Sequence, residues 1–435
     1  MKRRMVFWSW WLGWLVGVVV MSCNAPPPVS LAAIRPAIAS NQQDATLTIL
    51  GEGFESSAKA WLVGKDGQKI ALGTLRILTP QKAEVLLGKG GQAGIYDLLW
   101  EQGGTEKRLG GAFEILAGAL TIDVVDVGQG DALLIRVSGG KSVLIDAGRE
   151  EDVDALISFL RAEGVTRFDY VIATHYDADH VGGFAKLVYG PDGRPNTEDD
   201  RRPTEGWWDR GGFSKSTSYA SVRDLFPSIR KVLDGNDASS FPSVDLGAGV
   251  KLQVVTANGA VVQKDGSIRR INCLDDENCR SIGTMISLGK FQFWTAGDLT
   301  GGGIETPDVE SVLAQTIDPV DVYRAHHHGS RTSSTQTFLD ALKPQAIVIS
   351  AGRQNSYCHP SDEVLKRLIP IPALALFVTT SGMIDAEKCG FVTNELVFGM
   401  GDRALLNAGN IRIQAGEDRY TIRSAAGEVR SYTTR

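Results

Sequence analysis

Four side chains that can bind a metal ion lie close together near the middle of the chain. The segment reads Thr174-His175-Tyr176-Asp177-Ala178-Asp179-His180-Val181-Gly182-Gly183, in a chain that holds only six histidines. It follows an apolar run at 169–174 that reads as a buried strand, so the ligands emerge where that strand ends. A tight turn with several nitrogen and oxygen ligands suits a divalent cation. The spacing predicts a strand, a turn and a helix, with His175 and Asp177 at one ion and Asp179 and His180 at a second.

Strands and helices alternate on both sides of this turn, which predicts an α/β domain over residues 119–390. Strands are expected at 121–126, 132–137, 142–145, 169–174, 251–256, 284–288, 291–296, 320–325 and 346–350. Helices are expected at 153–163, 335–342 and 360–368. In the first of these helices the apolar residues Val153, Leu156, Ile157 and Leu160 recur at helical spacing.

Further motifs follow in a fixed order along the same region. They are Asp126-Val127-Gly128-Gln129-Gly130-Asp131, Leu144-Ile145-Asp146-Ala147-Gly148, the pair Asn278 and Ser281, Thr295-Ala296-Gly297-Asp298, His327-His328-Gly329-Ser330, and the set Asn355, Tyr357, His359 and Pro360. With the histidine and aspartate cluster they resemble the metallo-β-lactamase superfamily, and within it the extracytoplasmic nuclease-like domain of the ComEC family of DNA-uptake proteins. The resemblance covers roughly residues 120–385. It implies a metallo-β-lactamase αββα sandwich and a hydrolase that cleaves phosphodiester bonds with two divalent metal ions.

The resemblance also implies a role for each matching residue. Metal ligands are implied at His175, Asp177, Asp179, His180, Asp298 and His328. Catalytic roles are implied for Asp179, which would orient the nucleophile, and for His327 and His359, which would contact the phosphate or transfer a proton. Residues that hold the ligands in place are implied at Asp126, Asp131, Asp146, Asn278, Ser281 and Ser330.

Three consecutive histidines follow the expected strand at 320–325. If the extended backbone continues through them, neighbouring side chains face opposite sides. We then expect His328 to bind the second metal, His327 to contact the phosphate and His326 to be a packed or surface residue. The choice between His327 and His328 as the ligand stays open at this stage.

The chain departs from the superfamily pattern in three places. No histidine lies between His180 and His326, so the third-motif histidine of many members has no counterpart. The first metal site is left with His175, Asp177, Asp298 and water, and an oxygen-rich site of this kind suits manganese at least as well as zinc. Cys358 stands where the ComEC pattern has glycine. The channel-forming helices of ComEC are not matched, so no transport activity is implied.

The first residues are typical of a secretion signal. A basic leader at 2–4 precedes an almost wholly apolar run at 5–21. The sequence Val20-Met21-Ser22-Cys23 resembles a bacterial lipoprotein signal, which predicts a signal peptide at 1–22, a lipidated Cys23 and a proline-rich tether at 24–30. An uncleaved anchor helix is the alternative. Both place the remaining chain outside the cytoplasm, as a membrane-anchored or secreted protein.

Residues 31–117 predict a small all-β domain. Short strands are expected at 45–50, 58–63, 69–72, 83–87, 94–100 and 111–116, with glycine-containing turns between several of them. The segments at 34–36, 48–54, 94–98 and 112–115 resemble the IPT/TIG immunoglobulin-like domain. The segment carries no catalytic cluster, so we expect it to act as a spacer with no identified partner. The remaining segment, 391–435, is expected to form a separate C-terminal β appendage.

Four cysteines remain after Cys23. In an oxidising compartment they are compatible with disulfides between Cys273 and Cys279 and between Cys358 and Cys389, although the sequence does not fix the pairing. Between His180 and Lys251 lies a long polar insertion that contains Trp207 and Trp208. It is expected to be a solvated surface loop, or else a lid whose tryptophans stack on a base.

Composition narrows the function classes. A chain with 43% hydrophobic and 22% charged residues is an ordinary globular protein rather than a disordered one. The net charge of −6 argues against a strong general grip on DNA. We therefore keep three interpretations: a nuclease-like phosphodiesterase acting on nucleic acid, a phosphodiesterase of cell-wall or lipid headgroups, and a non-catalytic, metal-stabilised binding module.

Overall fold

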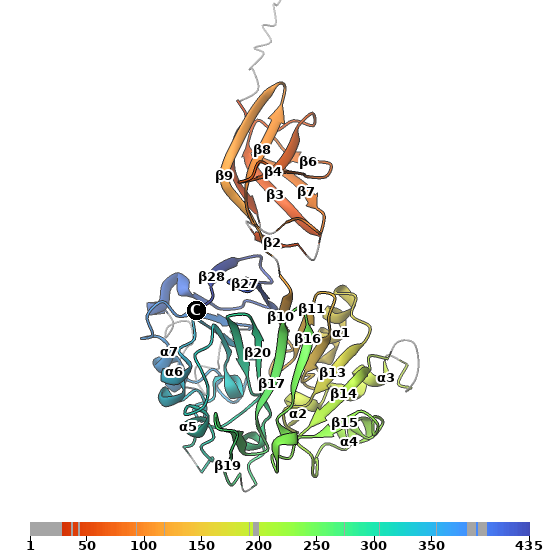
Figure 1. Ribbon diagram of the computed structural model, residues 1–435, viewed down its shortest axis with the longest axis vertical. Helices are drawn as coiled ribbons and strands as arrows, with labels where there is room; N and C mark the ends of the chain where they lie inside the picture. Colours follow the sequence, from red (N-terminus) through yellow and green to blue (C-terminus); the bar gives the residue numbers. More distant parts are fainter. Residues whose placement is uncertain are drawn as a thin grey trace, which may run out of the picture.

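The computed structural model describes residues 28–435, apart from 36–37, 42–43, 93, 117, 191, 195–199, 274, 304, 354, 381–388 and 390–397. The expected signal peptide, Cys23 and residues 24–27 of the tether lie outside the described residues. Figure 1 shows a small β-sandwich at the top and a larger α/β domain below it. In the described part of the chain, no helix is long and apolar enough to cross a membrane.

The N-terminal domain is a sandwich of two sheets, with strand orders β1-β3-β7-β6 and β2-β9-β8-β4-β5. Its strands are β1 (Ser30–Arg35), β2 (Ile38–Ser40), β3 (Ala45–Glu52), β4 (Lys59–Gly64), β5 (Lys69–Ala71), β6 (Arg76–Thr79), β7 (Lys82–Leu87), β8 (Gly94–Gln102) and β9 (Thr105–Leu116). Alternate side chains such as Leu47 of β3 and Leu62 of β4 fill one core between the sheets. Trp100 stacks on Phe54 in this core, with ring centroids 4.3 Å apart. The predicted immunoglobulin-like β-sandwich is confirmed at the level of the fold.

The larger domain contains two mixed sheets. The first has the order β15-β14-β13-β12-β11-β10-β26-β27-β28. Its strands are β10 (Leu120–Val124), β11 (Leu133–Val137), β12 (Ser142–Ile145), β13 (Phe168–Ile172), β14 (Pro203–Asp209), β15 (Arg230–Val232), β26 (Ile411–Ala415), β27 (Arg419–Ser424) and β28 (Val429–Thr433).

The second sheet has the order β19-β18-β17-β20-β21-β22-β23-β24-β25, with β16 paired to β17. Its strands are β16 (Ser243–Gly247), β17 (Val250–Ala257), β18 (Ala260–Val262), β19 (Ile268–Arg270), β20 (Gly283–Leu288), β21 (Phe291–Thr295), β22 (Val322–Arg324), β23 (Ala346–Ile349), β24 (Ala375–Val378) and β25 (Ala404–Leu405).

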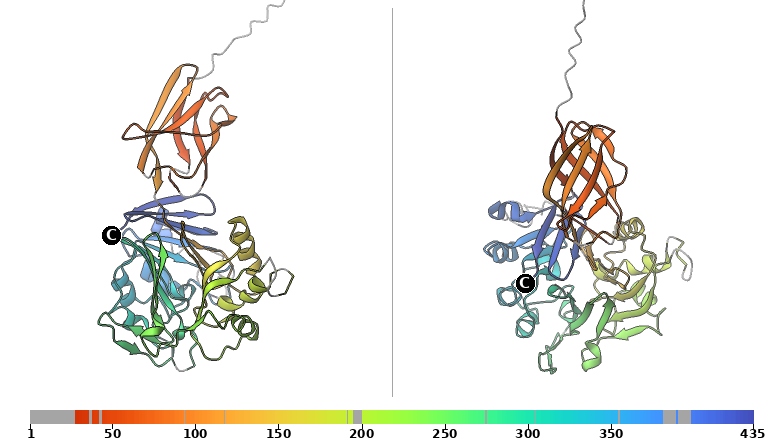
Figure 2. Two further views of the ribbon diagram at one scale, coloured as in Figure 1. Left: turned by 45° about the vertical axis from the view of Figure 1, so that its right-hand side comes forward. Right: turned by 45° about the horizontal axis from the view of Figure 1, so that its top comes forward.

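Helices cover the outer face of each sheet, which gives four layers (Figure 2). The helices are α1 (Val153–Ala162), α2 (Ala178–Val181), α3 (Phe184–Tyr189), α4 (Thr217–Arg223), α5 (Glu310–Leu313), α6 (Gln336–Leu342) and α7 (Asp362–Leu368), with 3₁₀ turns η1 (Ala238–Ser240), η2 (Asn278–Arg280), η3 (His326–Gly329) and η4 (Phe398–Arg403). Helices α1, α3 and α4 share a core with the first sheet, and α5, α6 and α7 share one with the second. This is the predicted αββα sandwich.

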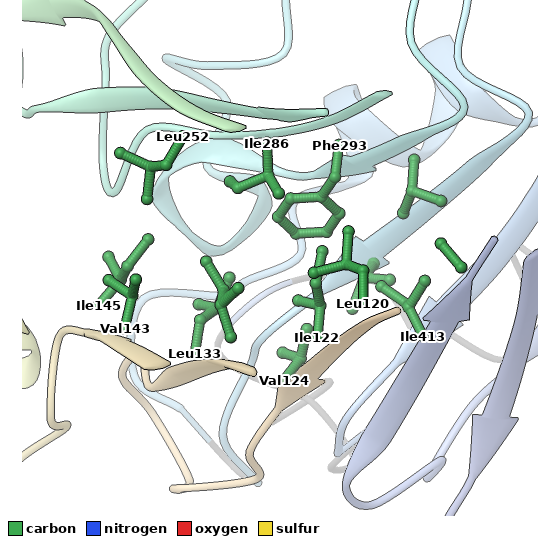
Figure 3. Packing of buried hydrophobic residues seen from close by; sticks show 14 of the residues in the cluster. Leu120, Ile122, Val124, Leu133, Val143, Ile145, Leu252, Ile286, Phe293 and Ile413 are labelled. Carbon is green, nitrogen blue, oxygen red and sulfur yellow. The ribbon is translucent and has the colours of Figure 1, made fainter. Parts of the chain in front are cut away.

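The two sheets face each other across a third, central core. Leu120, Ile122 and Val124 of β10 belong to the same cluster as Ile286 and Phe293 of the second sheet (Figure 3). Complete burial of one such side chain is worth roughly 1.5–3 kcal/mol. The central core therefore fixes the sheets face to face, so that loops from both sheets can meet at one edge.

The C-terminal strands are part of this domain, which corrects the expected boundary at residue 390. β26 pairs with β10 along its whole length, from Leu120–Ala415 to Val124–Ile411. Ile411, Ile413 and Tyr420 lie in the central core. A separate appendage would leave β10 at an open sheet edge, and β26 covers that edge instead.

The expected surface loop around Trp207 and Trp208 is also corrected. Both residues lie in β14, which pairs in parallel with β13. Trp207 is fully buried and Trp208 is 5% exposed, so neither can stack on a substrate base. The polar residues on either side of the two tryptophans made this buried strand look like a surface loop in the sequence.

Candidate metal centre

The predicted ligands lie at the carboxyl ends of strands from both sheets. β13 leads into the turn that carries His175 and Asp177 and then into α2. In the second sheet, β21 leads to Asp298 and β22 leads to η3, which carries His328. The carboxyl ends of such strands are where ligands gather in α/β sheets. The central core thus brings together residues that are far apart in the sequence.

Three buried imidazole rings point one nitrogen each into this cluster. The other ring nitrogen, Nδ1, lies 3.1 Å from Thr174 Oγ1 in His175, 2.8 Å from Asp146 Oδ2 in His180, and 3.0 Å from the Ser350 carbonyl oxygen in His328. The carboxylate and the carbonyl can only accept, and the Thr174 hydroxyl already donates to Asp146 Oδ2. Each Nδ1 therefore carries a hydrogen, and each Nε2 is the atom that can bind either a proton or a metal ion.

These Nε2 atoms have the surroundings that metal ligands need. All three are buried, and none has a hydrogen-bond partner among the described residues. His180 Nε2 lies 3.1 Å from Asp298 Oδ1, which is also buried without a partner. Two acceptor atoms at this distance repel each other unless a proton or a metal ion lies between them, and the carboxylates of Asp298 and Asp146 raise the pKa of His180 against the effect of burial. The residues present therefore fit the divalent metal ions that the sequence predicts.

The remaining carboxylates complete two groups of ligand atoms. Asp179 Oδ2 lies 3.4 Å from His328 Nε2, and Asp298 Oδ2 lies 3.5 Å from the same nitrogen. Asp298 Oδ2 also lies 4.0 Å from His175 Nε2. The ligand atoms of His175, His180 and Asp298 lie within 4.8 Å of one another, as do those of Asp179, His180 and His328. Asp298 thus lies between the two groups.

Asp177 is the most open of the expected ligands. Its Oδ2 atom lies 3.7 Å from His175 Nε2, and its side chain is 47% exposed. It therefore borders the first group on its solvent-exposed side.

The carboxylates of the cluster are held in their ionised form. Burial by itself would raise the pKa of Asp298, but the neighbouring His180, His328 and His327 hold it well below its usual range. Burial would also raise the pKa of Asp179, and the imidazoles of His328 and His180 lower it instead. An anionic, water-poor cluster of this kind attracts divalent cations.

The three consecutive histidines do not continue a strand, which corrects the basis of that prediction. They form η3, and both His327 and His328 have left-handed backbones, with φ of 50° and 53°. This turn places the His328 ring among the other expected metal ligands. The His327 side chain remains 21% exposed. His326 is fully buried on the other side: its Nε2 accepts a hydrogen bond from Trp294 Nε1 at 2.8 Å, and its Nδ1 donates to Glu310 at 2.7 Å.

Two of the expected supporting residues contact the ligand side chains directly. Asp146 accepts from His180, as described above. Asp131 lies 3.8 Å from His180 Nδ1 and forms a buried ion pair with Arg324. The preceding Gly130 is required because a Cβ atom there would collide with the carbonyl oxygen of Asp179.

The other supporting residues act through the backbone or at a distance. Ser281 Oγ accepts from the Asp298 backbone N–H at 3.2 Å, and the Ser330 backbone N–H donates to the His327 carbonyl. Asp126 does not reach the ligands. Its carboxylate accepts from Thr380 Oγ1 at 2.7 Å and from the Gly128 backbone, so it fixes a loop rather than a metal ligand.

His327, Asn278 and His359 line the more open side of the cluster. Asn278 Nδ2 lies 3.4 Å from His327 Nε2, and the His359 ring lies 5.3 Å from that of His327. Burial, with a contribution from the neighbouring histidines, lowers the pKa of His359 to about 3. Asn355 holds the His359 backbone from both sides, accepting from its N–H at 2.8 Å and donating to its carbonyl at 2.6 Å.

Two supporting residues were missed from the sequence, Arg324 and Glu310. Arg324 is fully buried and donates to the Gly297 carbonyl at 2.9 Å, next to Asp298. Glu310 is fully buried and accepts from His326 and from the backbone N–H groups of Ser334 and Thr335. A charged residue such as Arg324 within an apolar strand indicates a buried structural role and could have been recognised from the sequence. No local sequence pattern indicates such a role for Glu310.

The four cysteines that follow Cys23 form two disulfides in the structure. Cys273 is joined to Cys279 and Cys358 to Cys389, which are the two pairs expected. Cys358, in the position of the ComEC glycine, has a left-handed backbone with φ of 62°. That conformation explains why a glycine suits this position.

Comparison with known proteins agrees with this geometry. A family model of the metallo-beta-lactamase superfamily matches residues 125–244. The chain is 25% identical over 255 residues to Recombination protein 2 of Haemophilus influenzae, 29% over 254 residues to Competence protein ComA of Neisseria gonorrhoeae, and 26% over 264 residues to ComE operon protein 3 of Bacillus subtilis. Each match covers 57% of this chain but only 26%, 29% and 30% of the respective relative. The chain therefore spans less than a third of the length of these relatives.

Among solved structures, the chain is similar to the metallo-beta-lactamase FIM-1 from Pseudomonas aeruginosa in its mono-zinc form. That similarity has 11% identity and a TM-score of 0.19, and it covers 61% of this chain and 68% of the other. The sequence matches, the αββα layers and the ligand cluster agree with one another. The α/β domain of this chain is similar to the metallo-β-lactamase superfamily, whose family model matches residues 125–244, and it resembles part of the ComEC-family competence proteins.

Proposed function

We propose that this chain is an extracytoplasmic, metal-dependent phosphodiesterase that acts on DNA. The observation that carries the proposal is the cluster of His175, His180 and His328, whose buried Nε2 atoms face carboxylates and have no hydrogen-bond partner in the part of the chain that the structure describes. A non-catalytic module would not need so many unsatisfied buried ligand atoms, because each costs stability when no ion is bound.

Two groups of residues would hold the ions. His175, Asp177 and Asp298 would hold one, and Asp179, His180, Asp298 and His328 the other. Such ions, zinc or manganese, would supply positive charge at the phosphoryl oxygens and a lowered pKa for water.

The chain's own residues would bind and orient the phosphodiester on the open side. His327 and Asn278 offer polar groups beside the cluster, and the neutral His359 ring lies next to them. Asp179 accepts hydrogen bonds and would orient the attacking water. Asp131 and Arg324 would hold the rings of His180 and His328 in place on the side of their Nδ1 atoms.

The choice of DNA rests on two of the relatives, whose names refer to recombination and to competence. The extracytoplasmic location rests on the sequence alone, which predicts a lipoprotein-type signal at 1–22 and lipidation of Cys23. Figure 1 shows the N-terminal sandwich at one end of the α/β domain and α2 in the half away from it. This arrangement supports a spacer role for the sandwich, as in IPT/TIG domains, with the site directed away from the tether.

The test offers the full-length chain, with manganese or zinc, three substrates: linear DNA, circular single-stranded DNA and an aryl phosphodiester. The Asp298→Ala variant removes the shared ligand, and Asp340→Asn on the exposed face of α6 is the matched control. Cleavage of DNA that is lost only in Asp298→Ala is the expected result, and cutting of the circle would show an endonuclease. Turnover of the aryl ester alone would redirect the proposal to cell-wall or lipid headgroups. Inactivity on all three substrates would contradict a phosphodiesterase and favour a binding module.

A further inference from the structure

A large groove opens from the metal centre on the side of Asp177. It has a volume of about 1090 Å³ and is lined by Tyr176 and Asp177, the loop 210–215, and residues of the segments 270–273 and 275–280. Small-molecule sites usually have roughly 300–1,000 Å³. Figure 1 shows β15, α4 and β19, which surround this region, at the end of the domain away from the N-terminal sandwich. The groove is therefore large enough for more than one unit of a polymer.

One wall of the groove presents Phe213, whose side chain is 81% exposed. The loop that carries it is fixed by the buried Arg210. The Arg210 guanidinium donates to the carbonyl oxygens of Gly211 and Phe213 at 2.9 and 3.2 Å, and to both Glu277 oxygens at 2.5 Å. It also stacks on Tyr176, 3.9 Å from the ring centroid. The backbone of Phe213 is thus held rigidly while its ring faces solvent.

A second exposed aromatic ring stands on another side of the centre. Tyr357 is 60% exposed and stacks on His359, with centroids 5.9 Å apart. His359 in turn lies beside His327 and His328. Of the aromatic side chains whose exposure the structure describes, only Phe213 and Tyr357 are exposed. Phe213 lines the groove that Asp177 borders, and Tyr357 contacts His359, so each ring offers an accessible face on which a base could stack.

The charges along the groove are mixed rather than strongly basic. Lys215 and Arg270 are exposed on its walls, and Arg280 lies nearby. Asp234 and Asp275 oppose them, whereas Glu277 is paired with Arg210. Electrostatic attraction alone would therefore bind a polyanion weakly. Stacking on the aromatic rings has to supply part of the affinity, and stacking needs unpaired bases.

We propose that this groove binds a single, unpaired nucleic-acid strand, with one base stacked on Phe213, another on Tyr357, and phosphates contacting Lys215 and Arg270. The cleavage of the strand rests on the function proposed above, whereas its binding does not.

The test measures binding by fluorescence anisotropy with the full-length chain in chelator, so that no cleavage occurs. The probes are a labelled thymidine 12-mer, a 12-mer of abasic sites and a duplex of the same length. Because stacking on one aromatic ring contributes roughly 10-fold in affinity, the wild type with its two rings should bind the thymidine strand about 100-fold more tightly than the abasic strand, and Phe213→Ala should reduce that difference to about 10-fold. Lys215→Gln with Arg270→Gln should weaken both single strands alike. The slope of log affinity against log salt should not exceed about 2 in magnitude, since at most three cations take part.

The control is Leu86→Ala, which removes a side chain that is 52% exposed on the N-terminal sandwich and should leave every affinity unchanged. Equal binding of the duplex and the single strand, or a Phe213→Ala variant that binds like the wild type, would overturn the proposal. So would binding of phosphatidylglycerol vesicles in place of the oligonucleotide. Phe213-dependent binding without any cleavage in manganese or zinc would keep this inference and reject the phosphodiesterase. Cleavage of DNA without a contribution of Phe213 to binding would keep the phosphodiesterase and reject this inference.

Discussion

The Nδ1 atom of His180 lies 2.8 Å from Oδ2 of Asp146, and both side chains are buried. This hydrogen bond fixes the ring so that its Nε2 lone pair faces the metal centre. Asp146 also accepts from the Thr174 backbone and hydroxyl, so it connects two ligand-bearing turns.

We predict that Asp146→Asn lowers the affinity for metal without unfolding the domain. The amide keeps the shape of the carboxylate but loses the charge that makes His180 a better ligand. Loss of such a supporting contact typically costs 10- to 100-fold in affinity. Competition against a chelator of known affinity measures the change, with Asp340→Asn as control. An affinity equal to that of the wild type would show that His180 does not bind the ion.

Metal should stabilise the folded chain, because the ligands come together only in the native state. An ion at one hundred times its dissociation constant contributes about 2.7 kcal/mol. We therefore expect chelation to lower the Tm by about 5 °C or more. In Asp298→Ala the loss of the shared ligand should abolish most of this shift, and the bound metal measured by elemental analysis should fall. A Tm that is indifferent to chelator in the wild type would contradict the metal centre.

Acid should weaken the domain through Glu163, which lies away from the metal. Burial would raise the pKa of Glu163, but hydrogen bonds and charges from Arg412 and Arg136 lower it below its ordinary value. Both guanidinium groups lie 2.8 Å from Glu163 Oε2. A depressed pKa contributes stability above the unfolded pKa of about 4.3, and this contribution is lost as the pH falls through the folded value.

Urea unfolding in chelator at pH 7, 5 and 3.5 tests this expectation. Glu163→Gln should be less stable than the wild type at pH 7 and should lose less stability between pH 5 and 3.5. The exposed Glu150→Gln variant should retain the wild-type dependence on pH. An unchanged acid response in Glu163→Gln would show that the ion pairs do not contribute to stability.

The two disulfides should differ in their contribution to stability. Cys273 and Cys279 are six residues apart, and Cys358 and Cys389 are 31 apart. Loop-closure entropy gives about 2 kcal/mol for the shorter loop and about 4 kcal/mol for the longer one. Urea unfolding of Cys279→Ser and Cys389→Ser measures each loss. A larger loss in Cys279→Ser would show that contacts in the native state, rather than loop length, set the contribution.

Much of the site could be predicted because its ligands come in short motifs. The spacing of His175, Asp177, Asp179 and His180 within one turn is a local property, and the motif around Asp298 follows a recognisable strand. The resemblance to the metallo-β-lactamase superfamily also predicted the αββα layers, which the structure confirms. Local chain geometry and motif order survive in the sequence because each depends on neighbouring residues.

Burial was harder to predict than the ligands. Trp207 and Trp208 were expected at the surface, yet they lie in β14, whereas the rings of Phe213 and Tyr357 are exposed. The side chains around β14 are polar in sequence, and only its pairing with β13 makes it a core strand. The exposure of a residue depends on what packs against it in the folded chain. A local sequence pattern does not contain that information.

By itself, the sequence determined the strand–turn–helix that carries the first ligands, the all-β character of the N-terminal domain and the ordered motifs of the larger one. Only the tertiary structure decided which contacts between distant segments complete these elements. Asp123 of β10, for example, bonds to Arg412 of β26, 289 residues further along the chain. The left-handed turn at His327 and His328, the buried Glu310 behind His326 and the groove beside Asp177 likewise arise from distant segments. Such pairings depend on which sheet edges and hydrophobic faces meet once the whole chain has collapsed, and that is a global property of the fold.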